Sequence, residues 1–430
     1  YEDFVYSSKY LEGALLCFLK RKGLVAPNKP SDRKEMMQAL RDNEQEKFIG
    51  AYVKDPIVGK YDWVYDLDLT SLYPSIIMTI NISPETKVAK IADWDVQKYM
   101  KREVDYYQMG DNKISRDNLE KYIKEVDLTV SSNGVLYRKD KIGCIPEILD
   151  IWFNERVEFR KLEKKYGQEG DKEKYAFYGK RQLVQKILLN SLYGVLGLPA
   201  FRFYDIDNAE AVTTTGQTVI KNSANMGNIK YNKELGTTDV DSNIYIDTDS
   251  VFFSAVPLLD FRHPNWKAMP DSEVAVLVDG IAGEMQDYLN KFYDILSDKF
   301  FNVQNHRLEI KKEYVARAGI WIAKKRYAQW IISNNGVAVD RLDVKGLDVR
   351  RSSFPKAFQD CMGTVLIDIL KGKTEEELTA FVLAFKKSMV DRPIHEIAKN
   401  SAVKNLSKYS PKKRQIFHME KGAPAHVKAA

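Results

Sequence analysis

The sequence contains little cysteine and no long hydrophobic run. Its three cysteines, Cys17, Cys144 and Cys361, are far apart and form no CxxC pair, so neither a disulfide framework nor a zinc site is indicated. No apolar stretch is long enough to cross a bilayer, and there is no internal repeat. We therefore expect a protein of a reducing cytoplasm with no membrane partner. The first residues, 1–4, lack the pattern of a signal peptide or a natural start, and predict a fragment, a processed chain or one half of a split gene.

Acidic and basic residues are distributed unevenly along the chain. Hydrophobic residues make up 44% of the sequence and charged residues 29%, which is ordinary for a globular protein of one large or several smaller domains. Residues 311–430 hold 24 Lys and Arg against 12 Asp and Glu, a net charge of +12. Subtraction from the totals of 66 and 60 leaves 42 against 48 for residues 1–310, a net charge of −6. A basic C-terminal part is typical of a module that binds a polyanion, although a solvated basic surface has the same composition.

Apolar periodicity and turn residues predict a mixture of helices and strands. We expect helices over residues 8–23, 147–168, 171–193, 207–227 and 271–298, and a mostly helical, basic region from residue 355 onward. We expect strands over residues 63–69, 243–254 and 307–333, the second of these as two short strands around a turn. The short loop between the helices at 147–168 and 171–193, the latter ending at Gly194, implies an antiparallel helical hairpin.

Three aspartates lie on predicted strands in positions that suit divalent metals. Phosphoryl transfer needs positioned metal ions more than covalent chemistry by the protein, and carboxylate oxygens suit magnesium. Asp247 and Asp249 flank a turn between two apolar strands, where two acids are costly without a cation. Asp68 is followed by a turn closed by Pro74, whose amides could cradle a triphosphate. The alternative is an ordinary Asp-rich hairpin turn. Asp66, on the same strand face as Asp68, is expected to be a supporting or structural residue.

One face of the helix predicted over 171–193 carries an unusual set of side chains. Lys186, Asn190 and Tyr193 recur at i, i+4 and i+7, so a cation, an amide and an aromatic ring share one stripe. This combination fits a surface that meets a triphosphate at one end and a base pair at the other. Arg156 and Arg160, one turn apart on the preceding helix, would complete a phosphate clamp, although a solvated helix face is the alternative for each arginine alone.

These residues resemble the motifs of a known family. The string DLTSLYPSI at 68–76 is similar to motif A of family B DNA polymerases, KxxxNSxYG at 186–194 to motif B, YIDTDS at 245–250 to motif C, and KKRY at 324–327 to the thumb motif. NISPET at 81–86 and SNGVLY at 132–137 further resemble the replicative polymerases of large tailed bacteriophages. The motifs occur in the family's order and the resemblance runs over almost the whole chain, which makes it specific.

The resemblance implies a right-hand polymerase with an α+β fold: an antiparallel-sheet palm, helical-hairpin fingers and a mostly helical, incomplete thumb. The implied parts are residues 1–50, leading into the palm; 51–148, the first part of the palm; 149–197, the fingers; 198–320, the second part of the palm; and 321–430, the thumb. The implied activity is DNA-templated addition of deoxynucleotides to a primer 3′-hydroxyl by a two-metal mechanism.

The resemblance also implies a role for each matched residue. The implied catalytic residues and metal ligands are Asp68, Asp249, Asp247 and the carbonyl of Leu69, which would hold two Mg²⁺ ions, with Mn²⁺ as a substitute. The implied nucleotide-binding residues are Leu69, Ser71, Leu72, Tyr73, Arg156, Arg160, Lys186, Asn190, Tyr193 and Gly194, with Tyr73 excluding a 2′-hydroxyl. The implied DNA contacts are Lys324, Lys325, Arg326, Tyr327, Arg351 and Ser352. Primer–template DNA, dNTPs, a separate exonuclease or N-terminal chain and a sliding clamp are the implied partners, in the cytoplasm of a bacterial host.

The chain departs from the family pattern at both ends. Only about fifty residues precede the first palm strand, and they carry no pair of acids in a DxE-like strand, so we expect no 3′–5′ exonuclease in this chain. The sequence also ends shortly after Gly422, within what should be the thumb.

Two other functions are considered. One is a DNA-binding scaffold without catalysis, which the intact Asp68, Asp247 and Asp249 disfavour. The other is an RNA polymerase or reverse transcriptase with a similar palm, which Tyr73 and the KxxxNSxYG helix disfavour.

Overall fold

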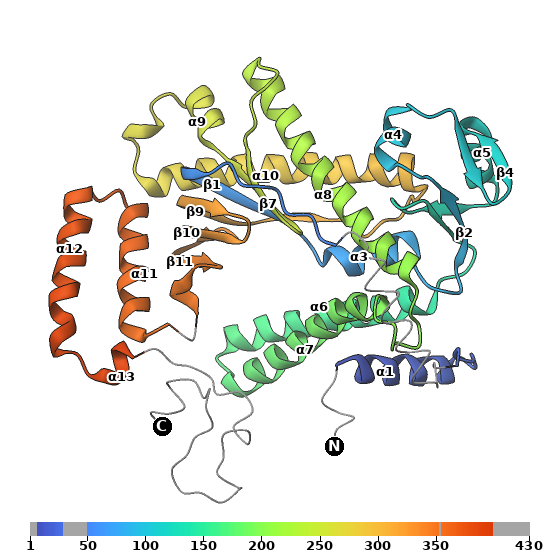
Figure 1. Ribbon diagram of the computed structural model, residues 1–430, viewed down its shortest axis with the longest axis horizontal. Coiled ribbons are helices and arrows are strands. Elements are labelled where there is room, and N and C mark those ends of the chain that lie inside the picture. Colours follow the sequence, from blue (N-terminus) through green and yellow to red (C-terminus); the bar gives the residue numbers. More distant parts are fainter. Residues whose placement is uncertain (1–6, 29–49, 352–353, 399–430) are drawn as a thin grey trace, which may run out of the picture. The chain divides into compact units, whose positions relative to one another are not determined.

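A computed structural model describes residues 7–28, 50–351 and 354–398 (Figure 1). The mixture of helices and antiparallel strand pairs confirms an α+β fold. The chain divides into two compact units, the first made of Tyr1–Asp55 and Tyr65–Tyr314 and the second of Pro56–Val64 and Val315–Ala430. No helix in the described ranges is long and apolar enough to cross a membrane.

The first unit contains most of the helices. They are α1 (Ser7–Arg21), α3 (Leu72–Ile80), α4 (Val96–Lys101), α5 (Arg116–Glu125), α6 (Cys144–Glu169), α7 (Lys172–Leu196), α8 (Ile206–Leu235), α9 (Val256–Arg262) and α10 (Asp271–Leu296). Its strands are β2 (Lys87–Ala92), β3 (Tyr106–Met109), β4 (Asn112–Ser115), β5 (Leu128–Val130), β6 (Val135–Arg138), β7 (Asn243–Asp247) and β8 (Ser250–Ser254). Strands β1 (Gly59–Leu69) and β9 (Ile310–Ala323) each contribute residues to both units.

The larger sheet of the first unit has the strand order β9-β1-β8-β7, and α8 packs on β7 and β8. The ring of Phe253 on β8 stacks between the rings of Tyr65 and Tyr231, with centroids 5.7 and 5.9 Å away. The two tyrosine hydroxyls are 3.0 Å apart. Gly227 permits this packing, because a Cβ there would lie 2.3 Å from Phe253 Cζ. The strand that ends at Asp68 is therefore fixed from one side by a buried aromatic stack.

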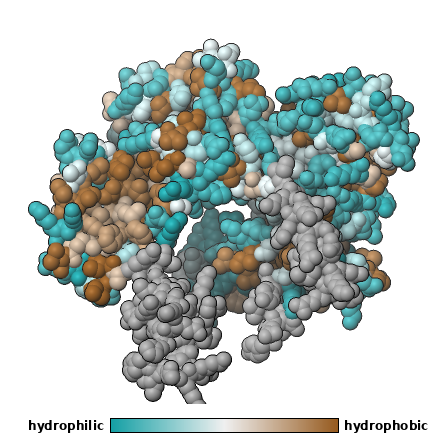
Figure 2. All heavy atoms as spheres, viewed as in Figure 1, coloured by the Kyte–Doolittle hydropathy of each residue, from teal (hydrophilic) through white to brown (hydrophobic). Residues whose placement is uncertain are grey.

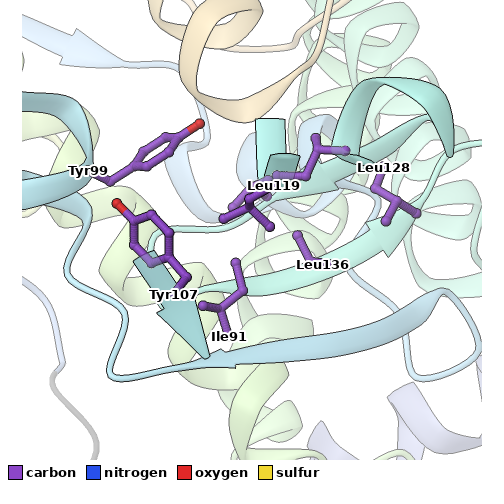
Figure 3. Packing of buried hydrophobic residues seen from close by; sticks show 8 residues of the cluster. Ile91, Tyr99, Tyr107, Leu119, Leu128 and Leu136 are labelled. Atoms are coloured by element: carbon purple, nitrogen blue, oxygen red, sulfur yellow. The ribbon is translucent and has the colours of Figure 1, made fainter. Parts of the chain in front are cut away.

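A smaller sheet with the order β4-β3-β2-β6-β5 has its own hydrophobic core. Figure 3 shows Tyr99 and Tyr107 beside the aliphatic side chains of Ile91, Leu119 and Leu136. All of these residues are at least nine-tenths buried. Residues 87–138 thus form a packed element of strands and helices with a core of its own.

The second unit contains the strand order β11-β10-β9-β1, with β10 (Arg326–Asn334) antiparallel to β11 (Val337–Lys345). Its helices are α11 (Lys356–Leu370), α12 (Glu375–Ser388) and the short α13 (Ile394–Ile397). Apolar side chains gather on the surface of these helices (Figure 2). They line an open cavity of about 730 Å³ next to Phe358 and Phe385.

Three expectations for the elements are wrong in detail. Helix α7 does not end at Gly194 but continues to Leu196, because the buried Val195 and Leu196 offset the roughly 1 kcal/mol that a helical glycine costs. The segment 307–333 is two strands that turn at Lys324–Lys325, and β11 is an additional strand. Strand β1 begins at Gly59 and not at residue 63. Trp63 within it has a φ of 51°, and Trp63, Val64 and Tyr65 are all buried.

Candidate active site

The end of β1 and the β7–β8 hairpin meet at one point in the first unit. The Leu69 amide donates a hydrogen bond to the Asp249 carbonyl at 2.9 Å. The Ser250 hydroxyl donates to Oδ2 of Asp68 at 2.8 Å. Asp68 and Asp249, far apart in the sequence, are therefore brought together by direct contacts between their strands.

Asp247 and Asp249 flank a tight turn. Thr248, between them, has a φ of 67°, a left-handed conformation that is rare for a β-branched residue. The Asp249 amide donates to the Asp247 carbonyl at 2.8 Å, and the Thr248 amide donates to the Tyr52 carbonyl at 3.1 Å. The unusual backbone is thus stabilised from inside the turn and from a separate segment.

The carboxyl groups at this point interact unfavourably as anions. Burial raises the pKa of Asp68 to about 7, and the neighbouring Asp249 carboxylate adds to this shift. Burial also raises the pKa of Asp249, with Asp247 and Glu313 contributing. Lys186 acts in the opposite direction and lowers the pKa of both Asp68 and Asp249. Clustered carboxylates of this kind gain free energy when a cation binds between them.

Asp66 lies on β1 next to this cluster but is only 1% exposed. Burial, followed by the charge of Asp68, raises its pKa well above the usual value. Within the described residues, its Oδ1 atom has no hydrogen-bond partner. The supporting role of Asp66 stays a prediction.

Motif A leads from β1 directly into a helix. Ser71 has a φ of 49° and precedes the first residue of α3, Leu72. The expectation that Pro74 closes a turn after Asp68 is wrong. Pro74 lies instead in the first turn of α3, where a proline is tolerated. Ser71 makes no side-chain capping hydrogen bond, so the first amides of α3 lack that partner. Uncapped amides at a helix N-terminus are suited to binding a phosphate.

Tyr73 is held in place by neighbours on two other helices. Its ring centroid lies 4.3 Å from that of Tyr193 on α7. On α8, a Cβ added at Gly216 would lie 3.2 Å from Tyr73 Cε1. Burial raises the pKa of Tyr73 far above its usual value, so its hydroxyl stays protonated.

The helical hairpin α6–α7 contributes the cations. Arg156 Nη1 lies 3.4 Å from the Ser71 hydroxyl, and its buried Nε has no hydrogen-bond partner within the described ranges. Burial, followed by the charge of Arg160, lowers the pKa of Arg156. Lys186 and Asn190 are exposed on α7. An exposed cationic surface with an unpaired buried guanidinium nitrogen can accept an anion.

The residues predicted for DNA contact lie in the second unit. Lys324, Lys325 and Arg326 are exposed around the β9–β10 turn, where Lys325 has a φ of 57°. Tyr327 is only 3% exposed and stacks on Trp321 at 6.0 Å between centroids. Arg351 is exposed and pairs with Asp348 at 3.0 Å. Ser352 lies outside the described residues.

Sequence reasoning missed two contributors to this site. Glu313 on β9 raises the pKa of both Asp68 and Asp249, but an acid in the charged string KKE carries no local signal. The other is the segment Gly50–Lys54, whose Tyr52 carbonyl binds the Thr248 amide. The only local indication that this segment belongs to the site is its position in the sequence, where the stretch from Val53 to Pro56 comes shortly before the strand of motif A.

The donor atoms at this point suit a magnesium site in which the protein supplies only some of the ligands. Among the described residues, no three His, Cys, Asp or Glu side chains are grouped closely enough to hold a metal ion by themselves. Magnesium is commonly held by one or two carboxylates together with waters and substrate phosphates. The neighbouring carboxylates of Asp68 and Asp249 fit that arrangement. They do not form a closed site for a permanent structural metal.

Comparison with known proteins decides the family. The chain matches the model of DNA polymerase family B over residues 6–258 and 282–429. The chain belongs to DNA polymerase family B. The family B sequence is 27% identical over 434 residues to the DNA-directed DNA polymerase of Escherichia phage RB69, covering 84% of this chain and 44% of the phage protein. It is 26% identical over 437 residues to that of Enterobacteria phage T4, covering 86% and 45%.

Archaeal family B polymerases are similar as well. DNA polymerase 1 of Pyrococcus abyssi is 28% identical over 373 residues, which cover 85% of this chain and 37% of the archaeal protein. The chain therefore spans less than half the length of the curated relatives that it matches.

Proposed function

We propose that this chain is the polymerising part of a DNA-templated, primer-dependent DNA polymerase. The observation that carries the proposal is the contact between motif A and motif C. Ser250 donates to Asp68 at 2.8 Å and Leu69 donates to Asp249 at 2.9 Å, while a tyrosine pair and the cations of α6–α7 lie around the same point. Family membership supports the same chemistry, since the phage relatives are named DNA-directed DNA polymerases.

The proposed parts follow the right-hand arrangement. Residues 51–148 and 198–320 form the palm, residues 149–197 the fingers and residues 321–430 the thumb region, with residues 1–50 leading into the palm. The helical hairpin α6–α7 supports the assignment of the fingers.

Each side chain in the palm has a proposed task. Asp68, Asp249 and the Leu69 carbonyl would hold two Mg²⁺ ions, with Asp247 in support. Such ions, when bound, would supply charge neutralisation for the attacking primer 3′-hydroxyl and the leaving pyrophosphate. The aspartates give up their protons before they bind a cation, which the raised pKa of Asp68 makes dependent on pH near neutrality.

The fingers and α3 are proposed to hold the nucleotide. Arg156, Arg160 and Lys186 bind the triphosphate oxygens by charge-assisted hydrogen bonds, together with Asn190. The backbone amides of Ser71 and Leu72 bind the same phosphates at the start of α3. Tyr193 and Gly194 form the floor under the new base pair.

Tyr73 is proposed to select deoxyribose. Its ring packs against Tyr193 and lies close to Gly216, so these neighbours restrict its movement away from a 2′-hydroxyl. A fixed ring discriminates by steric exclusion, which depends on the ring and not on its hydroxyl.

The proposed partners are primer–template DNA and dNTPs. Lys324, Lys325, Arg326 and Arg351 contact the DNA backbone, with Ser352 in the same role. Tyr327, which is 3% exposed and stacks on Trp321, supports the turn that presents them. We further propose a sliding clamp and a separate exonuclease or N-terminal chain as partners, in the cytoplasm of a phage-infected bacterium. If these 430 residues carry no 3′–5′ exonuclease, a mismatched primer will not be shortened when nucleotides are withheld.

A primer-extension assay tests the central proposal. The purified chain, a primed DNA template and Mg²⁺ are incubated with labelled dNTPs or rNTPs. Extension with dNTPs alone supports a DNA polymerase. Equal extension with rNTPs would indicate an RNA polymerase, and DNA binding without extension would indicate a scaffold.

A further inference from the structure

An extended segment, Gly50–Lys54, runs along β7, the strand at the edge of the larger sheet. Val53 forms an antiparallel bridge with Asp247. The Lys54 amide donates to the Ile246 carbonyl and the Thr248 amide donates to the Tyr52 carbonyl, both at 3.1 Å. The segment therefore pairs with backbone groups that an edge strand would otherwise expose, at the residues that carry motif C.

The same segment is attached to helix α8. The Gln217 side-chain amide donates to the Gly50 carbonyl at 2.6 Å. The Lys221 ammonium lies 4.3 Å from the centroid of the Tyr52 ring, within the range of a cation–π interaction. The turn of the β7–β8 hairpin is thus connected through this segment to a long helix of the same unit.

Lys54 connects the segment to the other end of β7. Its ammonium donates to the carbonyl oxygen and the Oδ1 atom of Asn243, the latter at 3.2 Å. It also pairs with Asp241 at 2.8 Å. Asp241 in turn accepts a hydrogen bond at 2.7 Å from Asn228 on α8. A single side chain therefore fixes the first residue of the strand that leads to the catalytic turn.

Asn243 lies at an irregularity in the strand pairing. The register of β7 against β8 shifts between Asn243 and Tyr245. The fully buried Asn243 side chain bridges this bulge, since Nδ2 donates to the carbonyls of Tyr245 at 3.2 Å and Phe252 at 3.1 Å. Bulges bend a strand and change the direction of the side chains that follow. The direction of β7 therefore depends on the hydrogen bonds that fix this bulge.

We propose that the segment Gly50–Lys54 positions the motif C turn, and that Lys54 is the residue that fixes it by holding the Asn243 bulge. The inference rests on the proposed function, because the turn carries Asp247 and Asp249. Lys54 is a positioning residue, since Asn243 precedes Asp247 by roughly 13 Å of strand. A small change in the direction of β7 would alter the spacing of Asp249 from Asp68, to which metal binding and catalysis are sensitive.

The test compares Lys54→Met with Lys54→Arg, which retains a donor. Lys60→Met, at an exposed lysine nearby, is the matched control. For Lys54→Met we expect an extension rate lower by about tenfold and a half-saturating Mg²⁺ concentration higher by about threefold. Duplex affinity is expected to stay within about twofold of wild type. Lys54→Arg is expected to restore most of the rate, and Lys60→Met to match wild type.

Hydrogen exchange of the intact protein provides a readout that does not require turnover. Lys54→Met is expected to speed amide exchange in residues 243–254, with little change over the smaller sheet. Unchanged exchange and Mg²⁺ dependence would overturn the inference. A loss of protection from exchange that spreads evenly over the first unit and is not rescued by Lys54→Arg would also overturn it. A wild-type chain that extends no primer would instead contradict the proposed function, while the exchange comparison would still decide the role of Lys54.

Discussion

The hairpins β7–β8 and β9–β10 are built alike but carry opposite charges. Each turns through a non-glycine residue with positive φ, Thr248 in one and Lys325 in the other. The first places Asp247 and Asp249 in a half-buried position, and the second leaves Lys324 and Lys325 exposed. A turn with the same left-handed residue therefore carries a half-buried acidic site in one hairpin and an exposed basic surface in the other.

The difference in burial predicts two kinds of function. Half-buried acids interact strongly with one another, as the raised pKa values of Asp68 and Asp249 indicate, so their effect depends on geometry and on a bound cation. Exposed cations act through long-range attraction that salt screens, so each contributes a small and similar amount. Substitutions in the first hairpin should abolish function, and substitutions in the second should weaken it gradually.

The largest effect is expected for the acids. Asp68→Asn or Asp249→Asn should lower the extension rate at least about a hundredfold, because each removes a charge that a metal ion needs. Duplex affinity should stay nearly unchanged, since phosphate contacts come from other residues. Steady-state extension and equilibrium DNA binding check this, with Asp117→Asn on the exposed face of α5 as a control. Extension within about tenfold of wild type in either variant would refute the assignment.

The next largest effect is expected for Tyr73, whose ring packs against Tyr193 and lies close to Gly216. Tyr73→Val should raise the use of rNTPs relative to dNTPs by at least about tenfold, because the space for a 2′-hydroxyl is opened. Tyr73→Phe keeps the ring and should keep the wild-type preference. Competition between dNTP and rNTP in single-nucleotide extension measures the ratio. A retained preference in an active Tyr73→Val enzyme would place the selection elsewhere.

A smaller effect is expected on stability in the absence of metal. The pKa of Asp68 in the folded protein, about 7, lies above the ordinary value near 4. The folded state therefore binds more protons than the unfolded state between these values, so the free energy of unfolding should decrease as pH rises through this window. Denaturant unfolding in EDTA at pH 5 and pH 7.5 measures the decrease. In Asp68→Asn the free energy of unfolding should fall less between these two pH values than it does in wild type. An equally large fall in that variant would exclude Asp68 as the cause.

The smallest effect is expected in the cationic hairpin. Lys325→Ala should weaken binding to all DNA sequences alike and flatten the plot of log affinity against log salt by roughly one unit. Lys356→Ala, at an exposed lysine paired with Asp360, is the matched control. Fluorescence anisotropy over a range of salt concentrations provides the slope. An effect confined to particular sequences would point to base recognition instead.

Much of the site can be predicted from local sequence. The helices α6 and α7 and the strands β7 and β8 follow from apolar periodicity with glycines or aspartates at their ends. The pairing of Asp68 with Asp249 follows from the motifs, because a metal site needs acids from rigid strands. The structure links the two segments by the hydrogen bonds from Ser250 to Asp68 and from Leu69 to Asp249.

Other features depend on contacts between distant segments. Nothing local in Glu313 indicates that its charge reaches Asp68 and Asp249. The partners of Lys54, Asp241 and Asn243, are far along the chain. Strand β11 is also missed, because its residues are mostly exposed and present no continuous apolar face. The boundaries of palm, fingers and thumb remain predictions.

Helix α12 has a consequence for the order in which the protein loses its structure. None of its described side chains is buried, and Val382 and Leu383 are about half exposed. A capping box of Thr374 and Glu377 stabilises its first turn locally, but few tertiary contacts support the rest. Elements of this kind open at a small fraction of the global free energy of unfolding. A protease should therefore cleave in or near α12 long before it cuts the strands around Asp68, and leave a core that still contains the acidic hairpin.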